Sequence, residues 1–388
     1  MLMMSRRARL VVLFTTVPIV TFTMVGGYLG RAVAREDTYR HLRIFEDVVS
    51  LISSNYVEDV ELDGVMAGAL RGLAGGLDTD STFLSAEEVA RIESGAPLPD
   101  GQLGVEVSRQ YYSRIIAARD GSPAARAGLV PGDYIRAING ESTRLLSALE
   151  SGRLLRDEPG STVRLSLLRG NTQEPYDIEL TRERLSPLPV SGRIMDGTVG
   201  YVRVGAFSQG IADEIQAEVA RLVAAGAKSL LIDVRGTAGG AFEDGIAAAR
   251  LFVESGTLLQ RVEHGDQQVL VEATAGADAI LERVVLLTNY GTAHAAELFV
   301  ASLAGTERAD RVGQRTGGRV SVQKLVKLSD GSGLWLSSAR YVSASGEPLH
   351  RLGIQPTVEV EIPFVELGEP AAPDDPILER GLEHLRAS

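Results

Sequence analysis

The chain has 388 residues, 44% hydrophobic and 23% charged, which is enough material for two domains with apolar cores. Its formal net charge of −12 at pH 7 argues against nucleic acid as a partner. The absence of cysteine excludes disulfide bonds, cysteine-based metal sites and a cysteine nucleophile.

The N-terminal segment has the composition of a membrane anchor. Arg6, Arg7 and Arg9 precede an uncharged, apolar stretch of 21 residues at 10–30. A bilayer requires about 20 such residues, whereas the apolar part of a cleaved signal peptide has about 7–15. A small-x-small pattern at 32–34 leaves cleavage open. We therefore expect either an anchor in the inner (cytoplasmic) membrane with the body exported, or a periplasmic or secreted protein.

Residues 36–95 are predicted to be mainly helical. Two apolar faces recur at helical spacing, made by Phe45, Val48, Val49 and Ile52 in the first and by Val65, Ala69, Leu70 and Leu73 in the second. Ser85 and Glu88 have the spacing of a capping box, which predicts another helix directly after Ser85.

Residues 96–184 are predicted to form a β-rich unit. Alternating apolar residues and turn signals predict strands over 103–107, 115–118, 134–138, 162–168 and 176–180, and helices over 122–129 and 145–156.

Residues 185–363 have an α/β pattern. Predicted strands cover 200–204, 229–235, 284–288 and 334–341, and predicted helices cover 211–225 and 242–252. A further helix is expected to start near Thr292, a good N-cap, with Leu298, Phe299 and Leu303 facing the core. His294 then lies in the first helical turn, where free backbone N–H groups point at whatever binds. An acidic, proline-rich tail at 364–388 holds a short helix near 376–386.

The stretch from Asn289 to Leu298 resembles the nucleophile segment of the C-terminal processing (tail-specific) peptidases, which are serine proteases with a Ser/Lys pair. His294 stands at the position of the family's attacking serine. The segment from Thr316 to Gln323 resembles the family's base segment, with Arg319 at the lysine position, 25 residues after His294. Gln323 is retained, so the resemblance assigns the nucleophile, base and support positions to His294, Arg319 and Gln323.

The segment from Asp233 to Gly240 resembles the family's oxyanion loop. The resemblance implies that backbone N–H groups at Gly239, Gly240 and Ala295 would form the oxyanion hole. The family's Asn-Pro is replaced here by Thr237 and Ala238.

Residues 96–184 resemble a PDZ domain, with Ala-Gly-Leu-x-Pro-Gly-Asp at 127–133 and Ile-Asn-Gly at 138–140 as markers. PDZ domains bind a C-terminal peptide as an added strand and hold its carboxylate on backbone N–H groups. The resemblance places that loop and strand edge at Leu103, Gly104 and Val105, with the 145–156 helix as the other wall. An occluded groove, with Leu103 and Val105 serving only as core residues, stays open.

The resemblance implies an α/β fold: a crotonase-like ββα-spiral peptidase core, an inserted β-rich PDZ domain and an N-terminal helical arm that can form dimer contacts. The expected divisions are an anchor or signal segment at 1–35, the arm at 36–95, the PDZ domain at 96–184, the core at 185–363 and the tail at 364–388.

Both altered positions argue against peptide hydrolysis. Arg319 cannot accept a proton near neutral pH, and His294 is left without a base. The first hypothesis is a pseudoprotease that binds polypeptide C-termini and regulates an active relative. The second is an active peptidase rebuilt around Thr292 or Ser321, and the third is a dimeric structural module of the cell envelope. No metal or cofactor is expected, because His294 and Glu297 supply only two ligands in one segment.

Overall fold

The computed structural model describes residues 40–170, 174–274, 279–369 and 374–387. The predicted anchor or signal segment at 1–35 lies outside the described residues. Within the described part, no helix is long and apolar enough to cross a membrane. The chain divides into two compact units, 1–69 and 70–388, which are described separately.

The first unit is helical where it is described. Residues 40–55 form one helix, and α2 (Leu62–Gly75) begins in this unit and ends in the next. Val48 remains 46% exposed, whereas Phe45 and Ile52 are partly buried. The predicted helices therefore form, and much of their apolar surface stays open to solvent in this chain.

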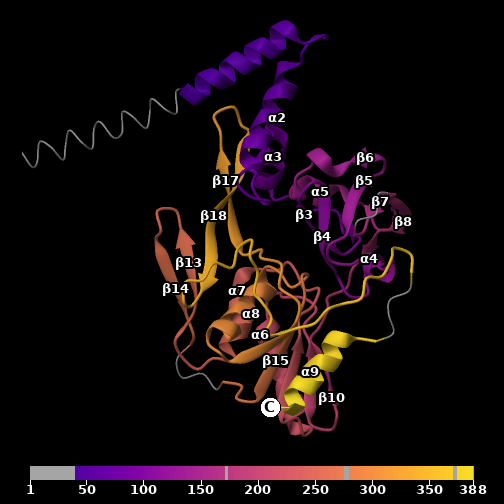
Figure 1. Cartoon of the computed structure of the whole chain (residues 1–388), viewed down its shortest axis with the longest axis vertical. Coiled ribbons are helices and arrows are strands. Elements are labelled where there is room, and N and C mark those ends of the chain that lie inside the picture. Colours follow the sequence, from indigo (N-terminus) through magenta and orange to yellow (C-terminus); the bar gives the residue numbers. More distant parts are fainter. Residues whose placement is uncertain (1–39, 171–173, 275–278, 370–373, 388) are drawn as a thin grey trace, which may run out of the picture. The chain divides into compact units, whose positions relative to one another are not determined.

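In the second unit, residues 101–184 form their own antiparallel sheet, with strand order β3-β4-β5-β7-β8 and β6 beside β5 (Figure 1). The strands are β3 (Val105–Arg109), β4 (Ser113–Ala118), β5 (Tyr134–Ile138), β6 (Glu141–Ser142), β7 (Thr162–Leu168) and β8 (Tyr176–Thr181). A short pair, β2 (Gly101–Gln102) and β9 (Glu183–Arg184), closes the unit at its entry and exit. Ile115, Ile135 and Leu165 are fully buried between this sheet and its helices.

Two helices complete the β-rich unit. α4 (Pro123–Arg126) is capped by Ser122, whose hydroxyl accepts from the N–H of Ala125. The helix predicted over 145–156 is shorter: α5 covers Ala148–Leu154, and a 3-10 turn, η1 (Thr143–Leu145), precedes it. A capping box between Ser147 and Glu150 fixes the later start.

The core of the second unit is built on a mostly parallel sheet, ordered β10-β11-β12-β15-β16-β19 in the described residues. Its strands are β10 (Ser191–Met195), β11 (Val199–Arg203), β12 (Ser229–Asp233), β15 (Arg283–Thr288), β16 (Ala309–Gly313) and β19 (Val358–Glu359). Only β10 pairs antiparallel to its neighbour. The sheet thus has the continuous apolar strands expected when both faces are covered.

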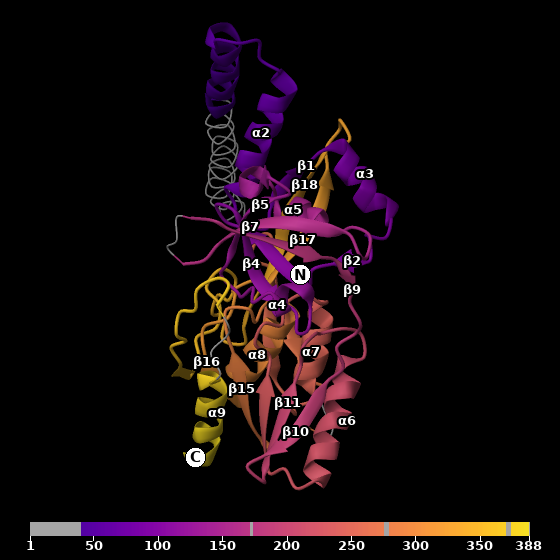
Figure 2. The same ribbon diagram turned by 90° about the vertical axis from the view of Figure 1, so that its right-hand side faces the viewer.

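Helices cover both faces of this sheet. Figure 2 shows α6 (Ile211–Ala224), α7 (Phe242–Arg250) and α8 (Ala295–Gly305) on one side and α9 (Pro376–Ala387) on the other. Leu298, Phe299 and Leu303 are fully buried as predicted. Since α8 is buried along nearly all its length, its first residues are held firmly against the end of β15.

A second sheet stands beside the core, ordered β1-β18-β13-β14 with β17 also on β18 (Figure 1). Its strands are β1 (Thr82–Leu84), β13 (Thr257–Glu263), β14 (Gln268–Glu272), β17 (Ser321–Lys327) and β18 (Gly333–Ser343). α3 (Ala86–Ser94) follows β1 and begins with the predicted Ser85–Glu88 capping box. β1 pairs with residues 333–335 of β18, and the turn before β1 reaches the start of β17, where Asp80 accepts a hydrogen bond from the Ser321 hydroxyl.

Candidate functional site

The turn between β15 and α8 differs from the prediction. The helix begins at Ala295, and His294 occupies the N-cap position with φ 54° and ψ −121°. Thr292 does not cap the helix: its hydroxyl donates to the carbonyl of Val234 at 2.9 Å and accepts from the N–H of Asn289 at 3.2 Å. The backbone conformation of His294, with its positive φ, costs about 1–3 kcal/mol. Strained residues of this kind are typical of functional turns between a strand and a helix.

The His294 side chain is bonded to the predicted oxyanion loop. The N–H of Gly239 donates to Nδ1 of His294 at 3.3 Å, so a neutral ring carries its proton on Nε2. The pKa of His294 is lowered to about 4, first by burial and second by the charge of Arg319, while the charge of Asp80 partly opposes this shift. The imidazole is therefore neutral at pH 7 and occupies a donor assigned to an oxyanion.

The glycines of this loop are required by their backbone. Gly239 and Gly240 have φ of 84° and 80°, and a Cβ on Gly240 would lie 2.2 Å from the carbonyl oxygen of Phe207. The N–H of Ala293 donates to the carbonyl of Thr237 at 3.0 Å, which ties the loop to the turn before α8. The structure thus brings Gly239 onto His294, with Ala295 buried as the first residue of α8.

Arg319 forms a nearly buried ion pair with Asp80; their side chains are 10% and 9% exposed. The other carboxylate oxygen of Asp80 accepts from the Ser321 hydroxyl at 3.2 Å. Gln323 donates to that same hydroxyl at 2.8 Å, so the retained glutamine supports the Asp80 cluster. The base position is therefore occupied by a cation whose charge is already balanced.

Asp80 was missed in the sequence because its partner lies 239 residues away. A local signal did exist: Asp78 Oδ1 accepts from the N–H groups of Asp80 at 2.9 Å and Ser81 at 2.6 Å, a turn that presents Asp80. His350 was also missed. Burial lowers its pKa, and neither ring nitrogen has a partner among the described residues.

Glu297 anchors the Arg319 loop. Its carboxylate accepts from the Thr316 hydroxyl and from the N–H groups of Gly318 and Arg319, both at 2.7 Å. Burial raises the pKa of Glu297 to about 7, although these donors favour the charged form. The carboxylate considered as a metal ligand in the sequence is thus occupied by hydrogen bonds to the chain.

A buried network supports the oxyanion loop from behind. Asp233 accepts from Arg235 at 2.6 Å and from the hydroxyl of Tyr201 at 2.9 Å. Arg235 reaches Asp375 at the start of α9, at 2.6 and 2.8 Å. Arg203 donates to the Asp233 carbonyl at 3.0 Å. The Asp-x-Arg pattern therefore has a positioning role.

The predicted peptide-binding residues lie at the free edge of the β-rich sheet. Leu103 is 1% exposed, and Val105 begins β3, which pairs only with β4. Gly104 has φ 74°, and a Cβ there would lie 2.3 Å from Cβ of Ser122. Leu103 is thus a core residue, while β3 keeps one edge unpaired within the described chain.

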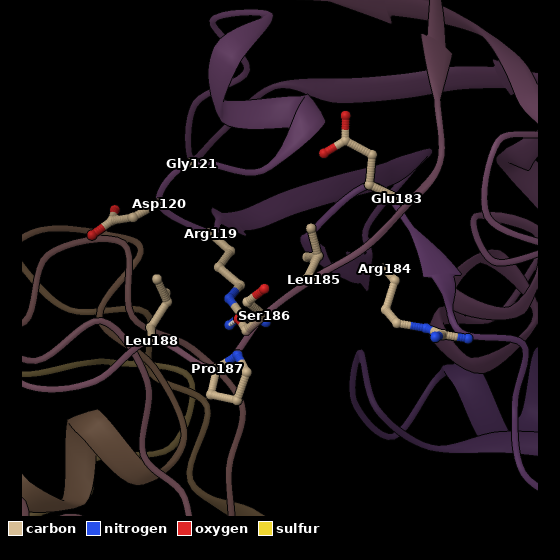
Figure 3. A pocket seen from close by; sticks show the side chains of 9 residues that line it. All are labelled: Arg119, Asp120, Gly121, Glu183, Arg184, Leu185, Ser186, Pro187 and Leu188. Carbon is tan, nitrogen blue, oxygen red and sulfur yellow. Dashed lines mark hydrogen bonds between the residues drawn. The ribbon is translucent and has the colours of Figure 1, made fainter.

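A separate pocket of about 280 Å³ lies where the β-rich unit joins the core (Figure 3). It is lined by residues 119–121 and 183–188, and none of the predicted site residues belongs to it. Asp120, Glu183 and Arg184 on its wall are each engaged in ion pairs. It therefore does not mark the altered site around His294.

The fold combines a mixed α/β core, which holds the altered site, with a separate β-rich unit that has the strand order described above. Residues 198–360 match peptidase family S41, and residues 114–169 match the PDZ domain. The chain belongs to the C-terminal processing peptidase family and carries a PDZ domain.

Individual relatives agree with this assignment. The carboxyl-terminal-processing protease of Synechocystis is 35% identical over 277 residues, covering 70% of this chain and 64% of the relative. The carboxy-terminal processing protease CtpA of Bacillus subtilis is 29% identical over 314 residues, covering 80% of this chain and 67% of the relative. The solved photosystem II D1 C-terminal processing protease shares the mixed α/β fold, with TM-score 0.69, 24% identity, and coverage of 82% and 92% of the two chains. The chain thus spans less than two thirds of the Synechocystis relative.

Proposed function

We propose that this protein is a catalytically inactive member of its family that binds polypeptide C-termini through its PDZ domain. The observation that carries the proposal is the pair of contacts at the altered site. The N–H of Gly239 is bonded to His294, and Arg319 is paired with Asp80. A donor needed for an oxyanion and the position needed for a base are both occupied by the chain itself.

Chemistry argues against hydrolysis at this site. Serine-type catalysis needs an activated hydroxyl, a base and an oxyanion hole. A guanidinium stays protonated near neutral pH, so Arg319, which is paired with the Asp80 carboxylate, cannot act as the base. Loss of a single catalytic residue in well-studied serine proteases costs about four to six powers of ten in rate.

The environments of Thr292 and Ser321, the two alternative nucleophiles, do not favour an active peptidase with a rebuilt site. Thr292 is fully buried and bonded to Val234 and Asn289. Ser321 donates to Asp80 and accepts from Gln323. Both hydroxyls serve local structure, and neither has a histidine or lysine base among its hydrogen-bond partners in the described chain.

Peptide binding fits the geometry of the PDZ unit. A strand added to the open edge of β3 would extend the sheet, and its terminal carboxylate would lie at the Leu103–Gly104 turn. Val105, which is only partly buried, gives this end of the groove an apolar wall, and that favours an apolar last residue. The third hypothesis, a dimeric module with an unused groove, predicts no such binding.

The remaining expectations belong to the same proposal. The apolar segment at 10–30 would hold the body on the exported side of the inner membrane, or be removed from a periplasmic protein. An active relative is the proposed regulatory partner, the helical arm is the proposed dimer contact, and the core is proposed to follow the crotonase-like ββα spiral.

The decisive test is turnover of casein and of peptides by the full chain, beside His294→Ala and the back-substituted His294→Ser/Arg319→Lys protein. We expect no hydrolysis by the unaltered chain and no difference in His294→Ala. Turnover that disappears in His294→Ala would overturn the proposal and establish a histidine-dependent hydrolase.

A further inference from the structure

Glu106 is an acidic residue on the open edge strand of the PDZ sheet. It is the second residue of β3, between Val105 and Val107, and its side chain is exposed. Val105 and Val107 pack against the PDZ core, so strand alternation turns Glu106 to the opposite face. On that face its Oε1 lies 3.4 Å from the place where a Cβ on Gly239 would stand. Glu106 thus lies between the peptide-binding edge and the altered peptidase site.

The Glu106 carboxylate has no ion-pair partner within 4 Å in the described residues. Desolvation by the surrounding chain raises its pKa, while Arg156 and Arg319 oppose that rise from a distance. The residue itself is exposed to solvent, and a cation placed beside its carboxylate would favour the charged form. One of these two cations, Arg319 on the core side, is already paired with Asp80.

An added peptide strand would alternate its side chains in the same way as β3. If the last residue points with Val105 and Val107 toward the PDZ core, the penultimate residue points to the face of Glu106. So does the fourth residue from the end. Directly opposed residues on one face of an antiparallel pair have Cβ atoms about 4.5–5.5 Å apart, which is within reach of a lysine or arginine.

We propose that Glu106 selects polypeptide C-termini with a basic residue at the penultimate position, and that the fourth position from the end contributes to the same preference. This inference rests on the proposed binding of C-termini by the PDZ domain. It adds the charge class of the ligand, which the apolar groove walls do not specify.

The test uses the full chain and fluorescein-labelled eight-residue peptides with a free C-terminus and valine as last residue. The penultimate residue is Lys, Ala or Glu, and binding is followed by fluorescence polarisation at low and high salt. Opposite charges across a strand pair contribute up to about 1 kcal/mol, so we expect roughly fivefold tighter binding of Lys than of Ala. The Glu peptide should bind weaker than Ala by a comparable factor, and added salt should reduce both differences.

Matched variants isolate Glu106. Glu106→Gln should bind the three peptides equally, and Glu106→Lys should reverse their order. Glu141→Gln, on the exposed β6 of the same domain, should keep the original order. Equal binding of the Lys and Glu peptides by the unaltered chain, or a preference that survives in Glu106→Gln, would overturn the inference while leaving C-terminal binding intact. Failure of every peptide to bind would instead remove the proposed PDZ function.

Discussion

The N–H of Gly239 and Nδ1 of His294 are joined by a 3.3 Å hydrogen bond, which links the predicted oxyanion loop to the predicted nucleophile position. His294 holds this bond from a backbone with φ 54°, at the junction of β15 and α8. The turn between β15 and α8 thus places the His294 ring on an N–H donor of the Gly239 loop.

The first prediction concerns pH. Burial lowers the pKa of folded His294 to about 4, against an ordinary value of 6.5 in the unfolded chain. Between these values the unfolded chain binds more protons, so the contribution of His294 to stability is present above about pH 6.5 and falls as pH decreases toward about 4. Urea unfolding at pH 7.0, 5.5 and 4.5 should show His294→Asn gaining stability relative to the unaltered chain as pH falls.

Exposed His264 provides the control for this experiment, and His264→Asn should track the unaltered chain across the same pH range. A constant difference between His294→Asn and the unaltered chain at all three pH values would show that the folded imidazole is not depressed in pKa.

The second prediction concerns the Asp80–Arg319 pair. Removing one partner of a buried ion pair typically costs about 3–5 kcal/mol, because the other charge is left uncompensated. We expect Asp80→Asn and Arg319→Gln each to lower the free energy of unfolding by roughly this amount, and the double variant to lose less than their sum. The exposed pair Arg164–Asp177 is the control: Arg164→Gln should cost less than about 1 kcal/mol. Additive losses in the Asp80/Arg319 cycle would mean that the two side chains do not interact.

The third prediction separates steric overlap from backbone strain at the oxyanion loop. Gly240→Ala would place a Cβ 2.2 Å from the carbonyl oxygen of Phe207, in addition to the positive φ of 80°. Gly197 has a similar φ of 77° and open space around it. We expect Gly197→Ala to cost about 1–2 kcal/mol and Gly240→Ala clearly more, as measured by denaturant unfolding. Equal costs would show that the loop moves freely away from Phe207.

The fourth prediction concerns the free carboxylate of the bound peptide. PDZ binding holds that group on backbone N–H donors, so amidation of the peptide's C-terminus should abolish binding to the full chain. Titration of matched acid and amide peptides by fluorescence polarisation provides the measurement. If both forms bind with the same affinity, the peptide does not occupy the groove through its terminus.

Local patterns predicted much of this molecule. The capping box at Ser85 and the buried apolar face of α8 follow from spacing alone. The helix start at Ala295 was misplaced because Thr292 has the chemistry of an N-cap but donates its hydroxyl to Val234, which directly follows β12 and lies 58 residues away in the sequence. Hydrogen bonds of that reach have no signature in local sequence.

For the candidate site, the sequence predicted which positions belong to it but not the partners that those residues bind. The spacing between positions 294 and 319 placed both residues in one site, where the charge of Arg319 lowers the pKa of His294. Their actual partners come from a turn near residue 80 and a loop near residue 239, which only the folded sheets bring together.

The ion pair between Arg235 and Asp375 makes the C-terminal segment part of the support of the Gly239 loop. Residues 376–387 are a helix whose Ile377 and Leu382 close one face of the central sheet, and Asp375 neutralises the arginine behind the Gly239 loop. A shortened chain ending before residue 374 would therefore expose the apolar surface of β12 and β15 and leave Arg235 with Asp233 alone. The acidic C-terminal segment therefore belongs to the core of the fold. Deleting it, or attaching a tag to it, should be expected to disturb buried contacts and not only the surface.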